Sequence, residues 1–482
     1  MTLTAELKSK IVYGITGAFI LLSAVLLYLE HFWVYLIPAA LAVILTAFFH
    51  LDKLLIFITF CVPFSVNLND VGGGFGLILP TEPLIFGAMV VFLYRVFLHQ
   101  EYDSRILRHP ITLSILFYLI WTFFTSIMSE LPLVSFKNLL MRCWYIIPFY
   151  FVGVLMMRQR KNFIRFSWFY IVPMTGIIIY TTIRHASHNF DERFGHWVME
   201  PFFNDHTSYG AMIAFFIPII FTFFYKKDWN ITAKILTGFF FAFFLLGFVL
   251  SYTRAAWVSL AAALILWVFI AFKIRWWVIT LFTLLIGVSF FSFQTEIMQR
   301  LEKNRQDSSG DIAEHIKSIT NVATDASNLE RINRWNSATK MYLENPITGK
   351  GPGTYAKLYA PYQHSSDLTI ISTNSGDLGT AHSEYFQALS EQGTPGLIAF
   401  LAIVIFIFAR GIPLYYKLES KEDRRYLLAV ILALFTYLTH SFLNNFLDED
   451  KAAVPFWFCV AFITAMDIYG NKRANENDAL TE

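Results

Sequence analysis

His382 is the side chain of this sequence best suited to act as a general base. It directly precedes residues 383–389, which have the pattern of a helix start. The positive end of a helix dipole disfavours an imidazolium, so it leaves a neutral ring that can accept a proton near pH 7. A base that activates a hydroxyl group requires such a ring. The competing interpretation is a histidine with a purely structural role.

Two arginines could bind an anion. Arg254 lies in a very short polar gap between two apolar runs, and Arg193 precedes the polar patch Asn204-Asp205-His206. Desolvating a guanidinium is costly without an anion, and a guanidinium can hold phosphate oxygens in a bidentate manner. The pair therefore predicts a phosphate clamp. The alternatives are that Arg254 snorkels to lipid headgroups and that Arg193 pairs with its acidic neighbours.

Other chemistry-bearing patterns are weak. Asp448-Glu449-Asp450 fits the Asp-x-Asp pattern of metal-dependent sugar transferases, but no further ligand set is evident. Cys61, Cys143 and Cys459 all lie in or beside apolar runs, which favours small core residues over a disulfide framework or a zinc site. Ser-His-Asp, His-Glu-x-x-His and Cys-x-x-Cys patterns do not occur, so hydrolase and redox functions have no support. We expect no metal and no cofactor.

The composition indicates a membrane protein. Hydrophobic residues make up 56% of the chain and charged residues only 15%, whereas soluble chains carry about a quarter charged residues. The 37 Lys and Arg nearly balance the 35 Asp and Glu, which argues against nucleic acid as a partner.

Apolar runs predict an all-α polytopic membrane protein with about 12–14 transmembrane helices, because a bilayer core of about 30 Å needs about 20 apolar residues per helix. The runs lie at 11–29, 31–49, 53–66, 79–98, 109–128, 142–157, 164–183, 207–224, 233–252, 255–272, 276–293, 394–410, 425–443 and 452–469.

The short connections between these runs are alternately basic and poor in Lys and Arg. If the basic ones face the cytoplasm, both termini do too, and the chemistry-bearing residues lie outside. We therefore divide the chain into N-terminal transmembrane helices (1–183), central transmembrane helices (184–293), a large external segment (294–382), C-terminal transmembrane helices (383–470) and a cytoplasmic tail (471–482). The basic connections contain Arg105 and Arg108; Arg158, Arg160 and Lys161; Lys226 and Lys227; Lys273 and Arg275; and Lys417, Lys421, Arg424 and Arg425.

The external segment is partly helical. Between Arg331 and Leu343, apolar residues recur at three-to-four spacing, and Pro346 and Gly349 end the pattern. We expect this helix to lie along the membrane surface with its aromatic residues at headgroup depth. The glycine-rich run 349–353 lacks the Gly-Lys-Ser/Thr ending of a Walker loop, which favours a tight turn.

Several motifs over residues 190–410 resemble a known family. His382-Ser383 is followed, after nine residues, by Gly393-Thr394-Pro395-Gly396; upstream lie an Arg-x3-Trp helix start at Arg331 and a Pro-x-x-Gly-x-Gly turn at Pro346. Together with Ser251-Tyr252-Thr253-Arg254, and with Arg193 and Asn204 in the earlier outer loop, they resemble the O-antigen ligase and O-antigen polymerase superfamily. One departure is Thr253, which stands where the family usually has serine.

The resemblance implies a GT-C-like, multi-pass enzyme of the bacterial inner membrane with its active site on the periplasmic side. It implies metal-independent, inverting transfer of a glycan from an undecaprenyl-diphosphate donor. His382 would assist the acceptor hydroxyl, while Arg193, Arg254, Arg331 and Asn204 would bind substrate. The expected activity is that of an O-antigen ligase with lipid A core as acceptor; another repeat unit (polymerase) or a protein Ser/Thr (O-oligosaccharyltransferase) stays open.

A transporter or flippase of lipid-linked glycans is the main alternative from another class. It would also need a polytopic bundle and phosphate-binding arginines. It would not need a long external segment that ends in a helix-opening histidine. A transporter would also be expected to carry charges in mid-membrane or broken helices, whereas the notable polar residues here gather near one face. A membrane scaffold without chemistry is the third possibility.

Overall fold

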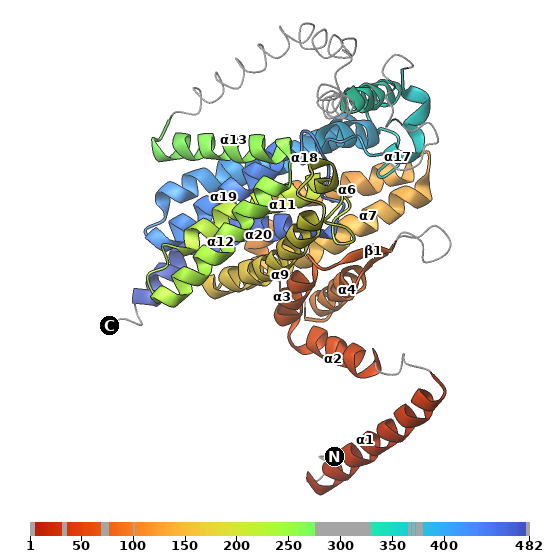
Figure 1. The fold of residues 1–482 in the computed structure, drawn as a ribbon, viewed down its shortest axis with the longest axis vertical. Helices are drawn as coiled ribbons and strands as arrows, with labels where there is room; N and C mark the ends of the chain where they lie inside the picture. Colours follow the sequence, from red (N-terminus) through yellow and green to blue (C-terminus); the bar gives the residue numbers. More distant parts are fainter. Residues whose placement is uncertain are drawn as a thin grey trace.

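The protein is a bundle of helices (Figure 1). The computed structural model describes residues 5–30, 36–68, 77–99, 102–274, 329–364, 368, 372 and 379–478. Within these ranges, nine helical segments are long and apolar enough to cross a membrane. They are Thr81–Leu98, Pro110–Ile127, Pro132–Met156, Arg160–Ser187, His206–Phe223, Ile231–Leu250, Arg254–Ala271, Glu384–Lys417 and Asp450–Gly470. The predicted all-α polytopic fold is thereby confirmed.

The helices follow one another along the chain with a single short β-hairpin between α3 and α4. The elements are α1 (Ala5–Tyr28), α2 (Leu36–Phe49), α3 (Leu51–Cys61), β1 (Val66–Leu68), β2 (Leu77–Leu79), α4 (Thr81–His99), α5 (Ser104–Leu107), α6 (Pro110–Ile127), α7 (Pro132–Ile146), η2 (Ile147–Val152), α8 (Gly153–Met156), α9 (Arg160–Ser187), α10 (Glu192–Gly195), α11 (His206–Phe223), α12 (Ile231–Leu250), α13 (Arg254–Ala271), a helix over 329–344, α17 (Tyr355–Leu358), η3 (Ala360–Tyr362), α18 (Glu384–Lys417), α19 (Lys421–His440) and α20 (Asp450–Asp478).

Each predicted apolar run overlaps a helix, except 276–293, which lies outside the described residues. The helices at runs 11–29, 31–49, 53–66 and 425–443 are not among the nine segments above. The run predicted over 142–157 begins earlier, at Pro132. Its first turns are polar because Arg142 and Asn138 are buried against the loop before α20. The Arg142 Nε lies 3.6 Å from Asp448 Oδ1, and the Asn138 amide donates to Asp448 Oδ2 at 3.2 Å. An ion pair in the protein interior thus replaces the apolar pattern.

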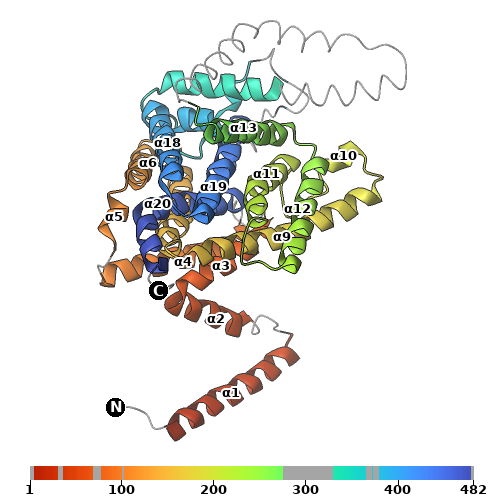
Figure 2. The same cartoon turned by 90° about the vertical axis from the view of Figure 1, so that its left-hand side faces the viewer.

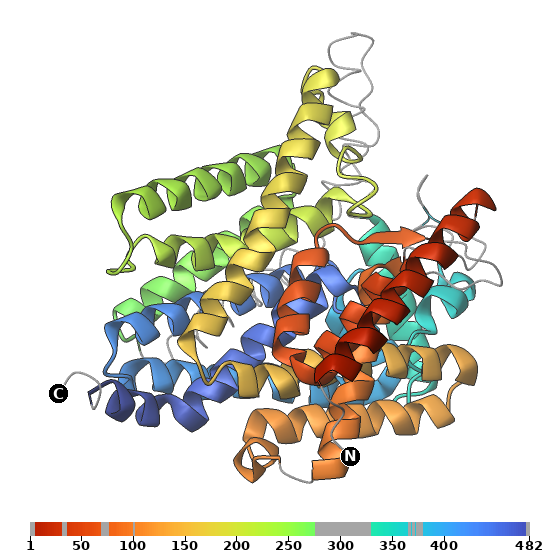
Figure 3. The same cartoon turned by 90° about the horizontal axis from the view of Figure 1, so that it is seen from below.

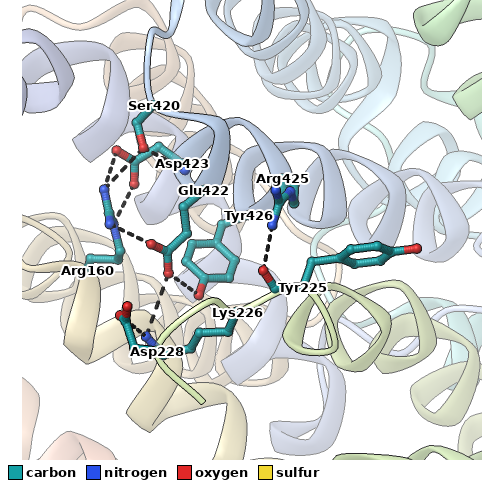
Figure 4. Close-up of polar contacts among 9 residues, drawn as sticks. All are labelled: Arg160, Tyr225, Lys226, Asp228, Ser420, Glu422, Asp423, Arg425 and Tyr426. Atoms are coloured by element: carbon teal, nitrogen blue, oxygen red, sulfur yellow. Dashed lines mark hydrogen bonds and ion pairs between the residues drawn. The ribbon is translucent and has the colours of Figure 1, made fainter. Parts of the chain in front are cut away.

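One end of the bundle is joined by charged loops (Figure 4). Arg160, the first residue of α9, donates to both carboxylate oxygens of Asp423 at 2.8 and 2.7 Å and to Glu422 at 2.9 Å. Lys226 lies 3.8 Å from Glu422, and Arg425 donates to the Tyr225 carbonyl at 2.7 Å. Three of the connections predicted to be basic therefore meet at the same end.

The opposite end collects the residues singled out from the sequence. Helices α11, α13, α18 and α20 begin there, and α12 and α19 end there. The hairpin is tied to this end as well, because Thr81 Oγ1 donates to Asp450 Oδ2 at 2.6 Å and Lys451 Nζ donates to Ser65 Oγ at 2.6 Å.

The outer parts of the chain lie at different edges of the bundle. Figure 2 shows α1 standing away from the other helices, while the helix over 329–344 covers the start of α18. Viewed from below, α9 (yellow) crosses the bundle and continues to the α10 segment at its far end (Figure 3). Buried apolar side chains of α9, α11, α19 and α20 belong to the main core, so these helices form the rigid support of the candidate site.

Candidate active site

The external helix over 329–344 docks onto the first turn of α18. Trp335 stacks on Phe386 with ring centroids 5.2 Å apart. Ala338 and Met341 are fully buried in a small core with Tyr355. That the helix lies along the membrane surface stays a prediction, and its apolar side chains at Ala338 and Met341 face protein. The apolar stripe is buried against protein, which removes it from water just as well.

A glycine-rich turn joins this helix to a break in α18. Gly349, Gly351 and Gly353 all have positive φ, as a tight turn requires. The turn pairs with α18 through backbone bonds: Gly351 N–H donates to the Glu391 carbonyl at 2.8 Å, and Thr394 N–H donates to the Pro346 carbonyl at 2.9 Å. The glycine-rich turn 346–353 and the glycine-containing stretch 391–396 of α18 are therefore bonded to each other, and we call this contact the joint.

The same joint reaches the α6–α7 connection. The Lys350 ammonium lies 2.7 Å from Glu130 and 2.6 Å from Glu344. Buried Glu391 accepts the Tyr355 N–H at 3.0 Å. The external helix, the α6–α7 connection and α18 are thus fixed to one another, and this sets where His382 lies relative to Arg331.

We expect Gly393→Ala to destabilise the protein by about 3 kcal/mol and to lower its activity with it. Gly393 has φ 66° and ψ −167°, a region that essentially only glycine occupies. A Cβ there would also lie 2.2 Å from the Ile347 carbonyl oxygen. Thermal unfolding in detergent measures the effect. Gly87→Ala is the matched control, since a Cβ at Gly87 meets nothing within 4 Å; equal melting temperatures of the two variants would contradict the joint.

His382 lies directly before Ser383, whose hydroxyl caps α18 by accepting the Phe386 N–H at 3.5 Å. The His382 backbone has φ 48°, which is uncommon for a residue other than glycine. Burial lowers the pKa of His382 to about 3, aided by the guanidinium groups of Arg334 and Arg331 and opposed by Asp205. Burial rather than the helix end is the main cause of this lowered pKa, which favours a neutral ring near pH 7; the role of His382 as a base stays a prediction.

Arg334 is held rigidly beside His382. Its Nε donates to Glu330 at 2.7 Å, its Nη1 donates to the Thr380 carbonyl at 2.9 Å, and the guanidinium lies 5.2 Å from the centre of the Tyr359 ring. Both Arg334 and Glu330 are buried. The guanidinium of Arg334 is therefore fixed at the Thr380 carbonyl, two residues before the candidate base in the chain.

Arg331 adds a second positive charge next to the ends of α19 and α11. Its Nε donates to the Leu443 carbonyl at 3.3 Å. Burial lowers the pKa of Arg331, and Asp205 opposes that shift. His440, the last residue of α19, is 1% exposed and interacts electrostatically with Asp205, Arg331 and His206. Within the described residues neither His440 ring nitrogen has a hydrogen-bond partner.

Asp205 and His206 open α11 at the same place. Asp205 caps the helix by accepting the Ser208 N–H at 2.8 Å. The His206 ring lies against His196 with centroids 4.1 Å apart. Carboxylate, imidazole and guanidinium groups from α11, α19, the external helix and the start of α18 thus form one polar cluster, whose central members are His382, Arg331, Arg334, Asp205, His206 and His440.

Arg193 and Arg254 are exposed, and it is their neighbours in the chain that make the contacts toward this cluster. Their segments touch, because a Cβ on Gly195 would lie 2.8 Å from the Tyr252 ring. The Thr253 hydroxyl donates to the His206 carbonyl at 2.8 Å, which connects the segment to the cluster. Within the part of the chain that the structure describes, neither arginine side chain forms an ion pair. The pairing of Arg193 with its acidic neighbours is limited to a backbone bond at 2.9 Å to Asp191.

Asn204 donates to Glu449 at 3.3 Å, at the mouth of a cavity of about 630 Å³. Burial raises the pKa of Glu449 to about 8, with Asp205 adding to the shift. Asp448 pairs with Arg142, Glu449 with Asn204 and Asp450 with Thr81. The three acidic side chains therefore have three different partners. Among the described residues, no group of three or more His, Cys, Asp or Glu side chains is arranged to hold a metal ion. Other residues lining the cavity are Asn67, Leu77, Ile78, Glu82, Lys137, Leu140, Met141, Trp144, Phe202 and Lys451.

Sequence reasoning did not single out His440, Arg142 or the Glu330–Arg334 pair. An arginine inside an apolar run is an available sequence indicator of a functional or structural ion pair, and Arg142 fits that description. His440 follows an apolar run without any motif, so only the fold could connect it with His382.

Fold and cluster together define a polytopic helical membrane protein with a polar centre at one end of its bundle. Residues 239–401 match the family described as O-antigen ligase. The match supports the chain's membership of the O-antigen ligase and polymerase family and covers the motifs from Ser251 to Gly396. It includes Arg254, Arg331 and His382 and excludes Arg193 and Asn204. A comparison with curated proteins finds no match.

Proposed function

We propose that this protein transfers a glycan from undecaprenyl diphosphate to an acceptor hydroxyl at the periplasmic face of the bacterial inner membrane, as an O-antigen ligase with lipid A core as acceptor. The family match over residues 239–401 supports the general class, a glycosyltransferase of the O-antigen ligase and polymerase type. The observation that supports the finer proposal is the lowered pKa of the partly buried His382, which interacts electrostatically with the guanidinium groups of Arg334 and Arg331 at the bundle end opposite the basic loops.

The chemistry follows from these charges. The acceptor oxygen attacks the anomeric carbon while its proton moves to a ring nitrogen of His382. The bond between that carbon and the diphosphate oxygen breaks, and the electron pair leaves with the diphosphate. Fixed guanidinium groups stabilise the leaving group most when its charge is fully developed, that is, in the transition state. Attack opposite the leaving group inverts the anomeric centre.

The arginines would also regulate the base. In the free protein, Arg334 and Arg331 oppose a proton on His382. An anionic diphosphate beside them replaces a net positive field with a negative one, which favours the imidazolium. His382 therefore becomes a stronger base once the donor is bound, so the acceptor is activated only when there is a sugar to transfer.

The cavity beside Asn204 and Glu449 suits a sugar. It combines carboxylates and amides, which bond to hydroxyl groups, with the indole of Trp144, which offers an apolar face. Its lining comes from the β-hairpin, α4, α7, the segment before α11 and the start of α20 with the loop that precedes it. We propose that the carbohydrate portion of a substrate occupies this cavity.

The proposal is tested with purified protein in proteoliposomes that contain an undecaprenyl-diphosphate-linked glycan and lipid A core. We expect glycan to appear on lipid A core without added metal and in the presence of a chelator. Product anomeric configuration, read by NMR, should be inverted relative to the donor. Transfer that stops when divalent metal is chelated would contradict the metal-independent mechanism.

A deletion strain separates the acceptors. A ligase deletion should remove long glycans from lipid A and leave their chain lengths on the lipid carrier unchanged. A polymerase deletion would leave single repeat units, and a protein transferase deletion would remove glycans from protein. Donor crossing the bilayer without any transfer in proteoliposomes would favour the flippase and overturn the proposal.

A further inference from the structure

A second cavity lies at the basic end of the bundle, far from His382. Its volume is about 520 Å³. Arg95 comes from the last turns of α4, and Lys161 and Arg165 come from the first turns of α9. The residues lining it are Phe49, Leu51, Asp52, Phe92, Arg95, Val96, Tyr102, Val152, Leu155, Met156, Gln159, Lys161, Asn162 and Arg165.

The charge in this cavity is strongly positive. Three cations face one carboxylate, Asp52. Lys161 and Arg165 are four residues apart and so share a face of α9; within the described ranges neither forms an ion pair. Arg95 donates to the Phe48 carbonyl, which uses only part of its five-donor fork. Uncompensated guanidinium and ammonium groups in a concave site favour an anion.

The position of the cavity fits the headgroup region of a bilayer. The span of α4 covers Thr81–Leu98, so Arg95 lies within its final turn, while α9 begins at Arg160. Arg165 lies about 6 Å farther into the bundle than Lys161 along the axis of α9. A group held between them is therefore at the boundary between polar loops and apolar helix surface.

Part of the cavity wall is apolar. Phe92, Val96 and Leu155 line it, and the neighbouring Phe49 and Phe97 are 71% and 80% exposed. A free phosphate would use the cations and leave this surface uncovered. An acyl chain would cover it, because burying apolar surface in contact with hydrocarbon is favourable. Asp52 and Gln159 can in turn accept hydrogen bonds from headgroup hydroxyls.

We infer that this cavity binds the phosphate of an anionic glycerophospholipid with a hydroxylated headgroup, in the leaflet that borders the basic loops. Basic pockets between helices at this depth are a recognised form of lipid-specific binding. The lipid would connect α4 to α9, two helices that both pack against α3. This site is independent of the proposed glycan transfer.

Native mass spectrometry of the full chain in neutral detergent tests the inference, with dioleoyl-phosphatidylglycerol as the probe. We expect the apparent Kd to rise about tenfold in the double variant Lys161→Gln/Arg165→Gln, since two charge-assisted bonds are lost. The control Arg108→Gln/Lys227→Gln removes the same charge from exposed residues at the same end and should bind like the unmodified protein. Dioleoyl-phosphatidylcholine should bind at least about tenfold more weakly than the anionic lipid.

Three outcomes would overturn the inference: equal binding by the two double variants, equal affinity for the two lipids, or displacement of the anionic lipid by millimolar inorganic phosphate, which would indicate a free-anion site. A photoactivatable phosphatidylglycerol gives a readout that does not depend on folding of a variant. It should label peptides from α4 and the first turns of α9 in the unmodified protein, and labelling confined to other helices would contradict the site.

Discussion

His382→Ala should lower the rate of glycan transfer by about 10²–10⁴-fold, the usual contribution of a general base. Donor binding should stay within about twofold, because Arg331 and Arg334 are held by their own partners, Leu443 and Glu330. Single-turnover transfer from an undecaprenyl-diphosphate-linked glycan measures the rate of the chemical step, and a donor-binding titration measures the affinity for the donor. The loss should therefore fall on kcat.

His50→Ala is the matched control, since His50 is an exposed histidine between α2 and α3 and should leave transfer unchanged. The pH profile gives a second readout. Because the pKa of His382 is lowered to about 3 in the free protein, the ring stays unprotonated from pH 8 down to pH 5. The kcat/KM should therefore not fall over that range through His382. Full activity of the alanine variant would remove the assignment of His382 as base.

The transmembrane helices could be predicted from hydropathy because lipid imposes one rule along the whole chain: backbone groups must bond within the helix and side chains must be apolar. The helical segment that contains Arg142 is an exception to that rule. Its polar first turns fit the bundle only because Asp448 lies opposite, and a partner so distant in the sequence is chosen by the tertiary fold. Hydropathy therefore places the helix and misses its start.

The candidate site was predictable in its parts and not in its assembly. Motifs indicated His382 and Arg331, and the structure brings these two into one charge cluster. The same cluster contains His440, which no local pattern distinguishes. Asn204 was expected to bind substrate, and here its amide bonds to Glu449; its role stays a prediction.

The glycine motifs illustrate the difference in physical terms. Each glycine run predicts a turn from its own residues, because positive φ is a local property. The turn after Pro346 also pairs with α18 near Gly393, the residue with non-helical φ and ψ. This pairing depends on backbone hydrogen bonds between segments far apart in the chain. Local conformation is encoded locally, whereas the joint that positions His382 is not.

Arg254→Lys should lower kcat/KM for transfer by about 10- to 100-fold although the charge is kept. Arg254 begins α13, a helix of 18 residues, and its side chain is exposed beside the polar cluster. An anion there meets both the guanidinium fork and the positive end of the helix dipole. A lysine keeps the point charge and one hydrogen bond but loses the second, parallel bond, which is worth about 1.5–3 kcal/mol to a charged group.

The series Arg254→Lys and Arg254→Ala separates charge from geometry. If the arginine grips diphosphate in the transition state, alanine should be the slower variant, lysine should recover only part of the loss, and both should affect kcat as well as KM. An arginine that merely reaches lipid headgroups would tolerate lysine, since an ammonium snorkels equally well. Arg108→Lys, an exposed change at the basic end, controls for altered membrane insertion. Near-normal turnover by the Arg254→Lys protein would reject a bidentate clamp, and the diphosphate would then have to be held by Arg331 and Arg334 in the interior of the cluster.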